Sequence, residues 1–147
     1  MIKKKKGYTL IELMAVIIIT TIIIGSSNSI INYYTKAIRN LETENFLTSI
    51  EGILTYSKAK AIKENKNFQI NFSKANSKVN LTQEGIVIES FKIPDYISVE
   101  NGSIIQISTN GQISSQTTVM KNYKDKEKYL LKIRVGVDYI NIEKEKW

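Results

Sequence analysis

Few side chains in this chain could carry chemistry, because it contains no Cys and no His. Disulfides, thiolate or imidazole metal ligands, and Ser-His or Cys-His catalytic pairs are therefore excluded. Asp95, Asp125 and Asp138 are the only aspartates, and their spacing is not that of a calcium-binding loop. Phosphate-binding glycine motifs are absent as well. We expect no catalytic residue, no metal site, no cofactor and no enzymatic activity.

Glu12 is the one carboxylate whose position needs a chemical explanation. It is followed by 23 residues without a charge, up to Lys36. A carboxylate costs about 2.5 to 3.5 kcal/mol at the centre of a transmembrane helix and less near its edge. Two interpretations are open. Glu12 reaches the lipid headgroups, or it pairs with a cation in an assembled state, since a buried charge is tolerated when it is paired.

The element that carries Glu12 is long and apolar enough to cross a membrane. Residues 8–31 would rise about 36 Å as a helix, at about 1.5 Å per residue. The hydrocarbon core of a bilayer is about 30 Å thick. Lys3 to Lys6 lie on the N-terminal side of this segment, and the positive-inside rule keeps such residues in the cytoplasm. We predict a single-pass protein of the cell membrane, in contact with lipid, with its C-terminus outside.

The net charge of +7 depends largely on these four lysines. Without them the count of Lys and Arg falls from 21 to 17 against 14 carboxylates, which leaves +3. A body of that charge is ordinary for a protein surface and is not the footprint of a nucleic-acid-binding domain. Nucleic acid therefore stays a conceivable partner that the sequence does not support.

After the apolar segment, residues 32–64 keep a helical rhythm. Apolar or small residues recur at spacings of mostly three and four, which predicts an amphipathic helix. They are Tyr34, Ile38, Leu41, Leu47, Ile50, Leu54, Ser57 and Ala61. The phase of this stripe slips between Leu41 and Phe46. The helix should end within residues 63–67, where an Asn can adopt the left-handed cap.

From Phe68 onward the apolar period becomes two, which predicts strands. The expected strands are 68–72, 78–81, 86–88, 91–93, 97–99, 104–107, 112–114, 117–120, 129–135 and 139–143. Asn101-Gly102 and Asn110-Gly111 are turn dipeptides, and the second favours a hairpin. Residues 121–128 combine Lys, Asp and Glu in a segment that we expect to be an exposed loop.

The residues Lys6-Gly7-Tyr8-Thr9-Leu10-Ile11-Glu12-Leu13, after the basic leader, resemble the N-terminal signal of type IV pilins and type II secretion pseudopilins. The resemblance implies that prepilin peptidase cuts between Gly7 and Tyr8 and that the new N-terminus at Tyr8 is methylated. It also implies that Glu12 pairs with the Tyr8 ammonium of a neighbouring subunit. Two positions depart from the common pattern: Tyr8 replaces the usual Phe, and Ser29 stands where many major pilins have Pro.

The resemblance implies an α+β, pilin-like fold in which one long N-terminal helix packs on an antiparallel sheet. The expected parts are a removed leader (1–7), a membrane-spanning half-helix (8–31), an exported amphipathic half-helix (32–64) and a β-rich domain (65–147). The second half also resembles the H-type minor pseudopilins and a competence pseudopilin of Gram-positive bacteria, in residues 61–65 before Phe68-Gln69-Ile70, in Asn110-Gly111 before Thr117-Thr118-Val119, and in the terminal segments 130–135 and 139–142. The Gly-Arg pair usual in the final turn of that class is absent.

The function implied is that of a minor pilin or pseudopilin in a type IV pilus, a type II secretion-like filament or a competence filament for DNA uptake. Its partners would be prepilin peptidase, other pilin or pseudopilin subunits and the inner-membrane assembly platform, and it would end at the cell surface or in a filament. Two alternatives remain. One is a DNA- or surface-binding minor pilin. The other is a conventionally secreted β-rich protein cleaved near Gly25-Ser26-Ser27, although no A-x-A pattern is present.

Overall fold

The computed structural model describes residues 8–74, 76–100, 104–134 and 139–146, without the side chains of residues 26–28 and 139. A single helix, α1 (Leu10–Glu64), takes up 55 residues and confirms the predicted long N-terminal helix. No Pro interrupts it, and it continues through Gly25 and Gly52. The chain divides into two units, residues 1–40 and 41–147, so that the boundary falls within α1.

The C-terminal end of α1 has the cap that the sequence predicts. Asn65 follows the last helical residue with a φ of 52°, and the Lys66 N–H donates a 3.3 Å hydrogen bond to the carbonyl of Ala61. Asn tolerates this left-handed conformation better than most residues, and the bond satisfies a carbonyl that the helix leaves unpaired. The chain is thereby released into the first strand at Phe68.

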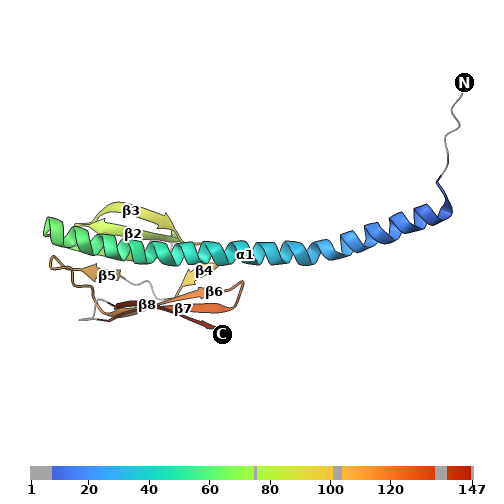
Figure 1. Ribbon diagram of the computed structural model, residues 1–147. Helices are drawn as coiled ribbons and strands as arrows, with labels where there is room; N and C mark the ends of the chain where they lie inside the picture. Colours follow the sequence, from blue (N-terminus) through green and yellow to red (C-terminus); the bar gives the residue numbers. More distant parts are fainter. Residues whose placement is uncertain (1–7, 75, 101–103, 135–138, 147) are drawn as a thin grey trace, which may run out of the picture. The chain divides into compact units, whose positions relative to one another are not determined.

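Within the described residues, eight strands follow the helix and form two antiparallel sheets (Figure 1). They are β1 (Phe68–Ser73), β2 (Lys78–Gln83), β3 (Ile86–Lys92), β4 (Ile97–Val99), β5 (Ile104–Ile107), β6 (Gln116–Asn122), β7 (Glu127–Arg134) and β8 (Tyr139–Lys146). One sheet has the order β3-β2-β1-β5, and the other has the order β4-β6-β7-β8. The α+β class is confirmed, and the division into two sheets is a detail that strand patterns alone did not contain.

One tight turn sets the register between β2 and β3 in the first sheet. Gln83 pairs with Ile86, and the intervening Glu84 and Gly85 have φ values of 52° and 83°. Two consecutive residues with positive φ make the type I′ turn, whose twist matches that of antiparallel strands. This turn is not among the predicted ones, and the prediction of two strands, 86–88 and 91–93, is wrong, because the structure has the single strand β3 there.

The predicted hairpin at Asn110-Gly111 is present, but it is shorter than expected. Gly111 has a φ of 79°, and Ile107 pairs with Ile113 through an isolated bridge. The prediction of a strand over residues 112–114 is therefore wrong. The hydroxyl of Ser114 accepts the Gln106 N–H at 3.0 Å. In a regular pair of strands a backbone carbonyl would accept this N–H, so the side chain here replaces a backbone hydrogen bond.

The core lies between the second part of α1 and both sheets. Its buried apolar residues come from the helix (Phe46, Ile50, Ile53, Leu54, Ala61), from the first sheet (Phe68, Ile70, Phe72, Val79, Leu81, Ile105, Ile107) and from the second sheet (Ile97, Val99, Met120, Tyr129, Leu131, Ile133). Burying a Leu, Ile or Phe side chain contributes about 1.5 to 3 kcal/mol relative to leaving it exposed. The helix and both sheets contribute to one core. The helix and the strands therefore depend on each other for stability.

The buried face of α1 corrects the predicted helical stripe. Tyr34, Ile38 and Leu41 are exposed, and the buried positions begin at Thr43 and Phe46. The slip in phase between Leu41 and Phe46 marks the place where the core begins. Leu47, a member of the predicted stripe, is only partly buried beside the core.

Candidate functional site

The candidate site lies at the N-terminal end of α1, where the sequence places Gly7, Tyr8 and Glu12. Gly7 lies outside the described residues, so only one side of the predicted cleavage junction is described. Tyr8 is 90% exposed and precedes the helix. Glu12 is in the first turn of α1 and is exposed as well. The two residues whose chemistry was predicted thus lie four positions apart in the chain, with Tyr8 just before the helix and Glu12 in its first turn.

Thr9 binds the Glu12 carboxylate through hydrogen bonds within the same chain. The backbone N–H of Thr9 donates to Glu12 Oε2 at 2.8 Å, and the Thr9 hydroxyl donates to the same oxygen at 2.9 Å. In return, the Glu12 N–H donates to Thr9 Oγ1 at 3.4 Å. This reciprocal pattern is the capping box, in which a Thr at the N-cap and a Glu three residues later satisfy N–H groups that the helix leaves unpaired.

The capping box adds a third interpretation to the two considered for Glu12. Its spacing, Thr-x-x-Glu before an apolar run, is a known sequence signature of a helix start, and the sequence analysis did not use it. A carboxylate has about four lone-pair sites. The bonds from Thr9 reach Oε2, so the cap does not exhaust the acceptor capacity of Glu12 and leaves room for an intermolecular cation.

The helix segment behind Glu12 presents apolar side chains on every face. All large apolar residues from Leu10 to Ile31 whose side chains are described are more than half exposed. A helix that is apolar all round belongs in the core of a large protein or in a membrane. Among the described residues, α1 is the one helix long and apolar enough to cross a membrane, with a mean hydropathy of 2.2 over its most apolar window.

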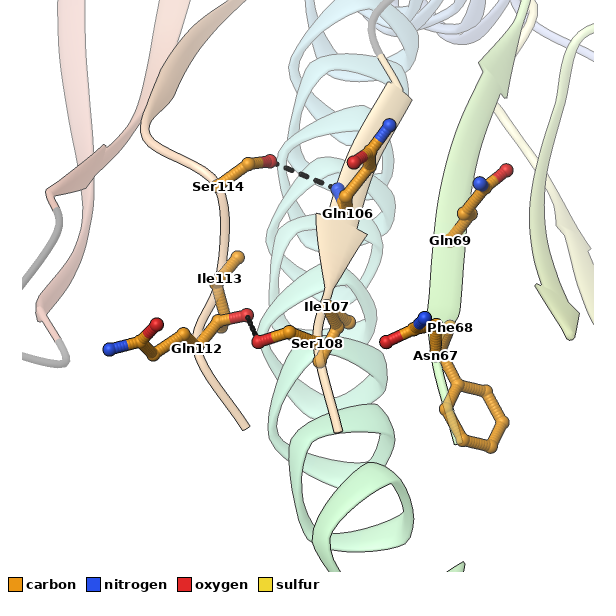
Figure 2. A pocket seen from close by; sticks show the side chains of 9 residues that line it. All are labelled: Asn67, Phe68, Gln69, Gln106, Ile107, Ser108, Gln112, Ile113 and Ser114. Atoms are coloured by element: carbon orange, nitrogen blue, oxygen red, sulfur yellow. Dashed lines mark hydrogen bonds between the residues drawn. The ribbon is translucent and has the colours of Figure 1, made fainter. Parts of the chain in front are cut away.

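The hollow drawn in Figure 2 is a second place where polar groups gather. It has a volume of about 470 Å³ and lies between the start of β1, β5 and residues 112–114. Its polar groups largely bond to one another. The Ser108 hydroxyl donates to the Gln112 carbonyl at 3.1 Å, and Asn67 Oδ1 accepts the Thr109 N–H at 3.1 Å. The first bond closes the turn at Asn110-Gly111 and the second ties that turn to the residue before β1, so the hollow follows from the position of the turn.

The predicted charged loop at residues 121–128 is a short turn instead. Strand β6 continues to Asn122 and β7 begins at Glu127, because these two end residues are buried and paired. Asn122 accepts the backbone N–H groups of Lys124 and Asp125 at 3.0 and 3.1 Å. The expectation of an eight-residue exposed loop was wrong, since only residues 123–126 form the turn.

Lysines at the borders of this turn are paired with carboxylates. Lys128 lies 3.3 Å from Glu145, and Lys121 forms an ion pair with Glu100. Cations whose charges are balanced nearby give a weak field for a polyanion. Within the part of the chain that the structure describes, this region supplies no argument for nucleic-acid binding.

Glu127 is the most buried charge in the same sheet. Its Oε2 accepts a 2.6 Å hydrogen bond from the Tyr129 hydroxyl, and Lys144 Nζ lies 2.9 Å from its Oε1. Burial pushes the pKa of Glu127 upward, but the hydrogen bonds from Tyr129 and Lys144, together with the Lys144 charge, outweigh it, so the pKa lies below its ordinary value. Burial and the neighbouring carboxylate raise the pKa of Tyr129. This triad ties β7 to β8 and is structural.

The described residues contain no group of three Asp or Glu side chains arranged to hold a metal ion. The absence of an enzymatic activity stays a prediction.

Residues 2–27 match the protein-family model described as the prokaryotic N-terminal methylation motif. The matched segment contains Gly7, Tyr8, Thr9 and Glu12 and most of the apolar run. Searches among curated proteins and among solved structures gave no significant match. The resemblance to a pilin-like prepilin signal is therefore confirmed, and it supports a substrate of prepilin peptidase that is anchored by one apolar helix. The resemblance to H-type minor pseudopilins stays a prediction.

Proposed function

We propose that this protein is a minor pilin or pseudopilin, a structural subunit of a type IV pilus, a type II secretion-like filament or a competence filament. The observation that carries the proposal is the methylation motif at the start of a helix whose first 22 residues expose their large apolar side chains. Such a helix needs lipid before assembly and sister helices after it, because water is a poor solvent for that surface. The β-rich unit would then be carried outside the membrane.

Processing is the first step of this function. Prepilin peptidase would cut between Gly7 and Tyr8 and methylate the new N-terminus at Tyr8. The exposure of Tyr8, two residues before α1 begins, supports access of a protease to an extended chain. Removal of residues 1–7 takes away Lys3 to Lys6, so that the Tyr8 ammonium becomes the cation nearest to Glu12 in sequence.

Assembly would use that ammonium. Glu12 of one subunit and the Tyr8 ammonium of its neighbour would meet among apolar side chains, where screening by water is weak and an ion pair is strong. The pair would set the axial register of each incoming subunit. The inner-membrane assembly platform would supply the work of extraction from lipid, with the N-terminus on the cytoplasmic side.

Mass spectrometry of the mature N-terminus tests this proposal. We expect a chain that starts at a methylated Tyr8, and we expect Gly7→Val to stay uncut in the membrane, because a side chain at that position crowds the extended substrate. Gly25→Val is the matched control, since a Cβ at Gly25 meets no atom within 4 Å, and it should be cut normally. A mature chain that begins near Asn28, or intact Met1 at the cell surface, would contradict the proposal.

A further inference from the structure

The apolar segment of α1 ends at two adjacent tyrosines. Tyr33 and Tyr34 are 74% and 64% exposed, and their rings meet edge to face with centroids 6.3 Å apart. Adjacent residues on a helix point about 100° apart, since one turn takes about 3.6 residues. The two rings therefore cover a broad sector of the helix surface just beyond Ile31.

Charge returns to the helix directly after these rings. Lys36, the first charged residue after Glu12, is exposed one turn beyond Tyr33. From Ile30 the helix thus carries two Ile, Asn32, two aromatic residues with a hydroxyl, Thr35 and then a cation. Tyr and Trp are enriched where membrane meets water because one end of the ring is apolar and the other forms hydrogen bonds.

The length between the two polar ends of the segment matches a bilayer. Residues 10–31 rise about 33 Å at about 1.5 Å per residue, against a hydrocarbon core of about 30 Å. The excess is accommodated by an ordinary helix tilt of about 20° or somewhat more. When the capping box of Thr9 and Glu12 lies at one headgroup layer, Tyr33 and Tyr34 therefore lie at the other.

We propose that Tyr33 and Tyr34 form an interfacial anchor that binds the phospholipid headgroup layer on the outer side of the membrane and sets the depth of α1. This rests on the proposed function, since it presumes a membrane-inserted subunit. The anchor assigns a role to residues outside the matched motif, which ends at residue 27. It also implies that extraction into a filament must move both rings out of the interface.

Depth-dependent quenching by brominated phosphatidylcholine tests the anchor. The full chain is placed in vesicles at low protein density, with Trp147→Phe removing the single natural tryptophan and Tyr33→Trp adding a reporter. We expect emission shifted to the blue of that in water, quenched more strongly by lipids brominated near the headgroups than by lipids brominated near the chain ends. Emission as in water without quenching would overturn the proposal. Blue-shifted emission that neither lipid quenches would also overturn the proposal, because a protein surface and not lipid would then cover residue 33.

Two further reporters separate this proposal from the membrane span itself. Ile22→Trp, in the middle of the apolar run, should be quenched most by the deeply brominated lipid. If it is not quenched at all, the proposed membrane insertion fails, and the anchor fails with it. Ile22→Trp that is quenched while Tyr33→Trp is not leaves the span intact and overturns the anchor alone.

Replacing both rings tests whether they set the depth. In the Ile22→Trp background, Tyr33→Ala with Tyr34→Ala should shift the quenching of the reporter toward a different depth, because the anchor is gone. Replacing both tyrosines by Trp, which has the same interfacial preference, should restore the original ratio of shallow to deep quenching. The signal of the Ile22→Trp reporter is obtained by subtracting the emission of a chain that carries Tyr33→Trp and Tyr34→Trp but retains Ile22. An unchanged ratio in the Ala variant would mean that the tyrosines lie at the interface without positioning the helix, which overturns the proposal.

Discussion

Two isoleucines on the same helix differ in burial. Ile18 is 57% exposed in the first unit, whereas Ile50 is fully buried in the second. Both belong to α1, so the backbone is the same and only the side-chain neighbours differ. The helical backbone is therefore common to both parts, although only the second part packs in the core. What differs is the distribution of apolar residues, which cover every face in the first part and one face in the second.

The largest expected effect on function concerns assembly through the first part of the helix. Glu12→Ala should insert and be cleaved, because removing a charge eases insertion, yet crosslinking should detect about tenfold less of it in filaments, since a loss of about 1.4 kcal/mol suffices for that factor. Glu51→Ala, an exposed carboxylate in the second part, is the control and should assemble normally.

Glu12→Gln distinguishes the ion pair from the helix cap. Gln at this position still completes a capping box, but it carries no charge for the Tyr8 ammonium. We expect Glu12→Gln to fail in assembly as Glu12→Ala does. Normal assembly of Glu12→Gln would assign Glu12 to the cap with Thr9, and normal assembly of Glu12→Ala would leave it as a residue that merely reaches the headgroups.

The comparison of the two isoleucines is tested directly by truncating each. Ile50→Ala should lower the free energy of unfolding of the β-rich unit by about 2 to 5 kcal/mol, because a cavity opens in the core. Ile18→Ala should change it by less than about 0.5 kcal/mol. Urea unfolding of the full chain in detergent, followed by near-ultraviolet circular dichroism of the tyrosines, measures both. Equal losses would mean that the two parts of α1 share one core.

Gly111 and Gly25 give a second comparison between the β-rich unit and the first part of α1. A Cβ at Gly111 would lie 2.7 Å from Ile62 Cδ1 at a φ of 79°, so Gly111→Ala should destabilise the β-rich unit by about 1 to 3 kcal/mol. Gly25→Ala meets open space and should leave that unit unchanged, while favouring the helix by about 1 kcal/mol. Thermal unfolding of both variants gives the answer. A stable Gly111→Ala would mean that the turn relaxes without cost.

The smallest expected effect is on pH dependence and is confined to the second unit. Because the pKa of Glu127 in the folded state lies below its ordinary value of 4.5, the stabilisation is complete above that value and is lost as pH falls through the folded-state pKa. Glu127→Gln should flatten this acid loss, at a cost of about 1.5 kcal/mol near neutral pH for the charged hydrogen bonds. Tyr129→Phe, which removes one donor, should flatten it in part. Urea midpoints measured from pH 3 to 7 test both variants. If the urea midpoint of Glu127→Gln falls with decreasing pH as steeply as that of the unchanged protein, Glu127 is not the source of the acid loss.

Local sequence signals predicted much of the fold and of the site. The uninterrupted apolar run predicted the first part of α1, and the Asn at its end predicted the cap at Asn65, because both depend on neighbours within a few residues. The motif around Gly7, Tyr8 and Glu12 was recognisable for the same reason. The bond pattern between Thr9 and Glu12 was readable too, as a capping box, and was missed because the carboxylate was considered for its charge alone.

Other features of the fold depend on contacts between residues far apart in sequence. Alternation predicts a strand, but it does not say that β5 joins the sheet of β1 while β4 joins that of β6. It does not say that Phe46 faces the core ahead of Leu47, or that Glu127 is buried against Tyr129 and Lys144. These choices are set by which surfaces meet on folding. Turn geometry and the alternation of apolar residues fix the register within a hairpin, but they do not determine which strands that are distant in sequence become neighbours.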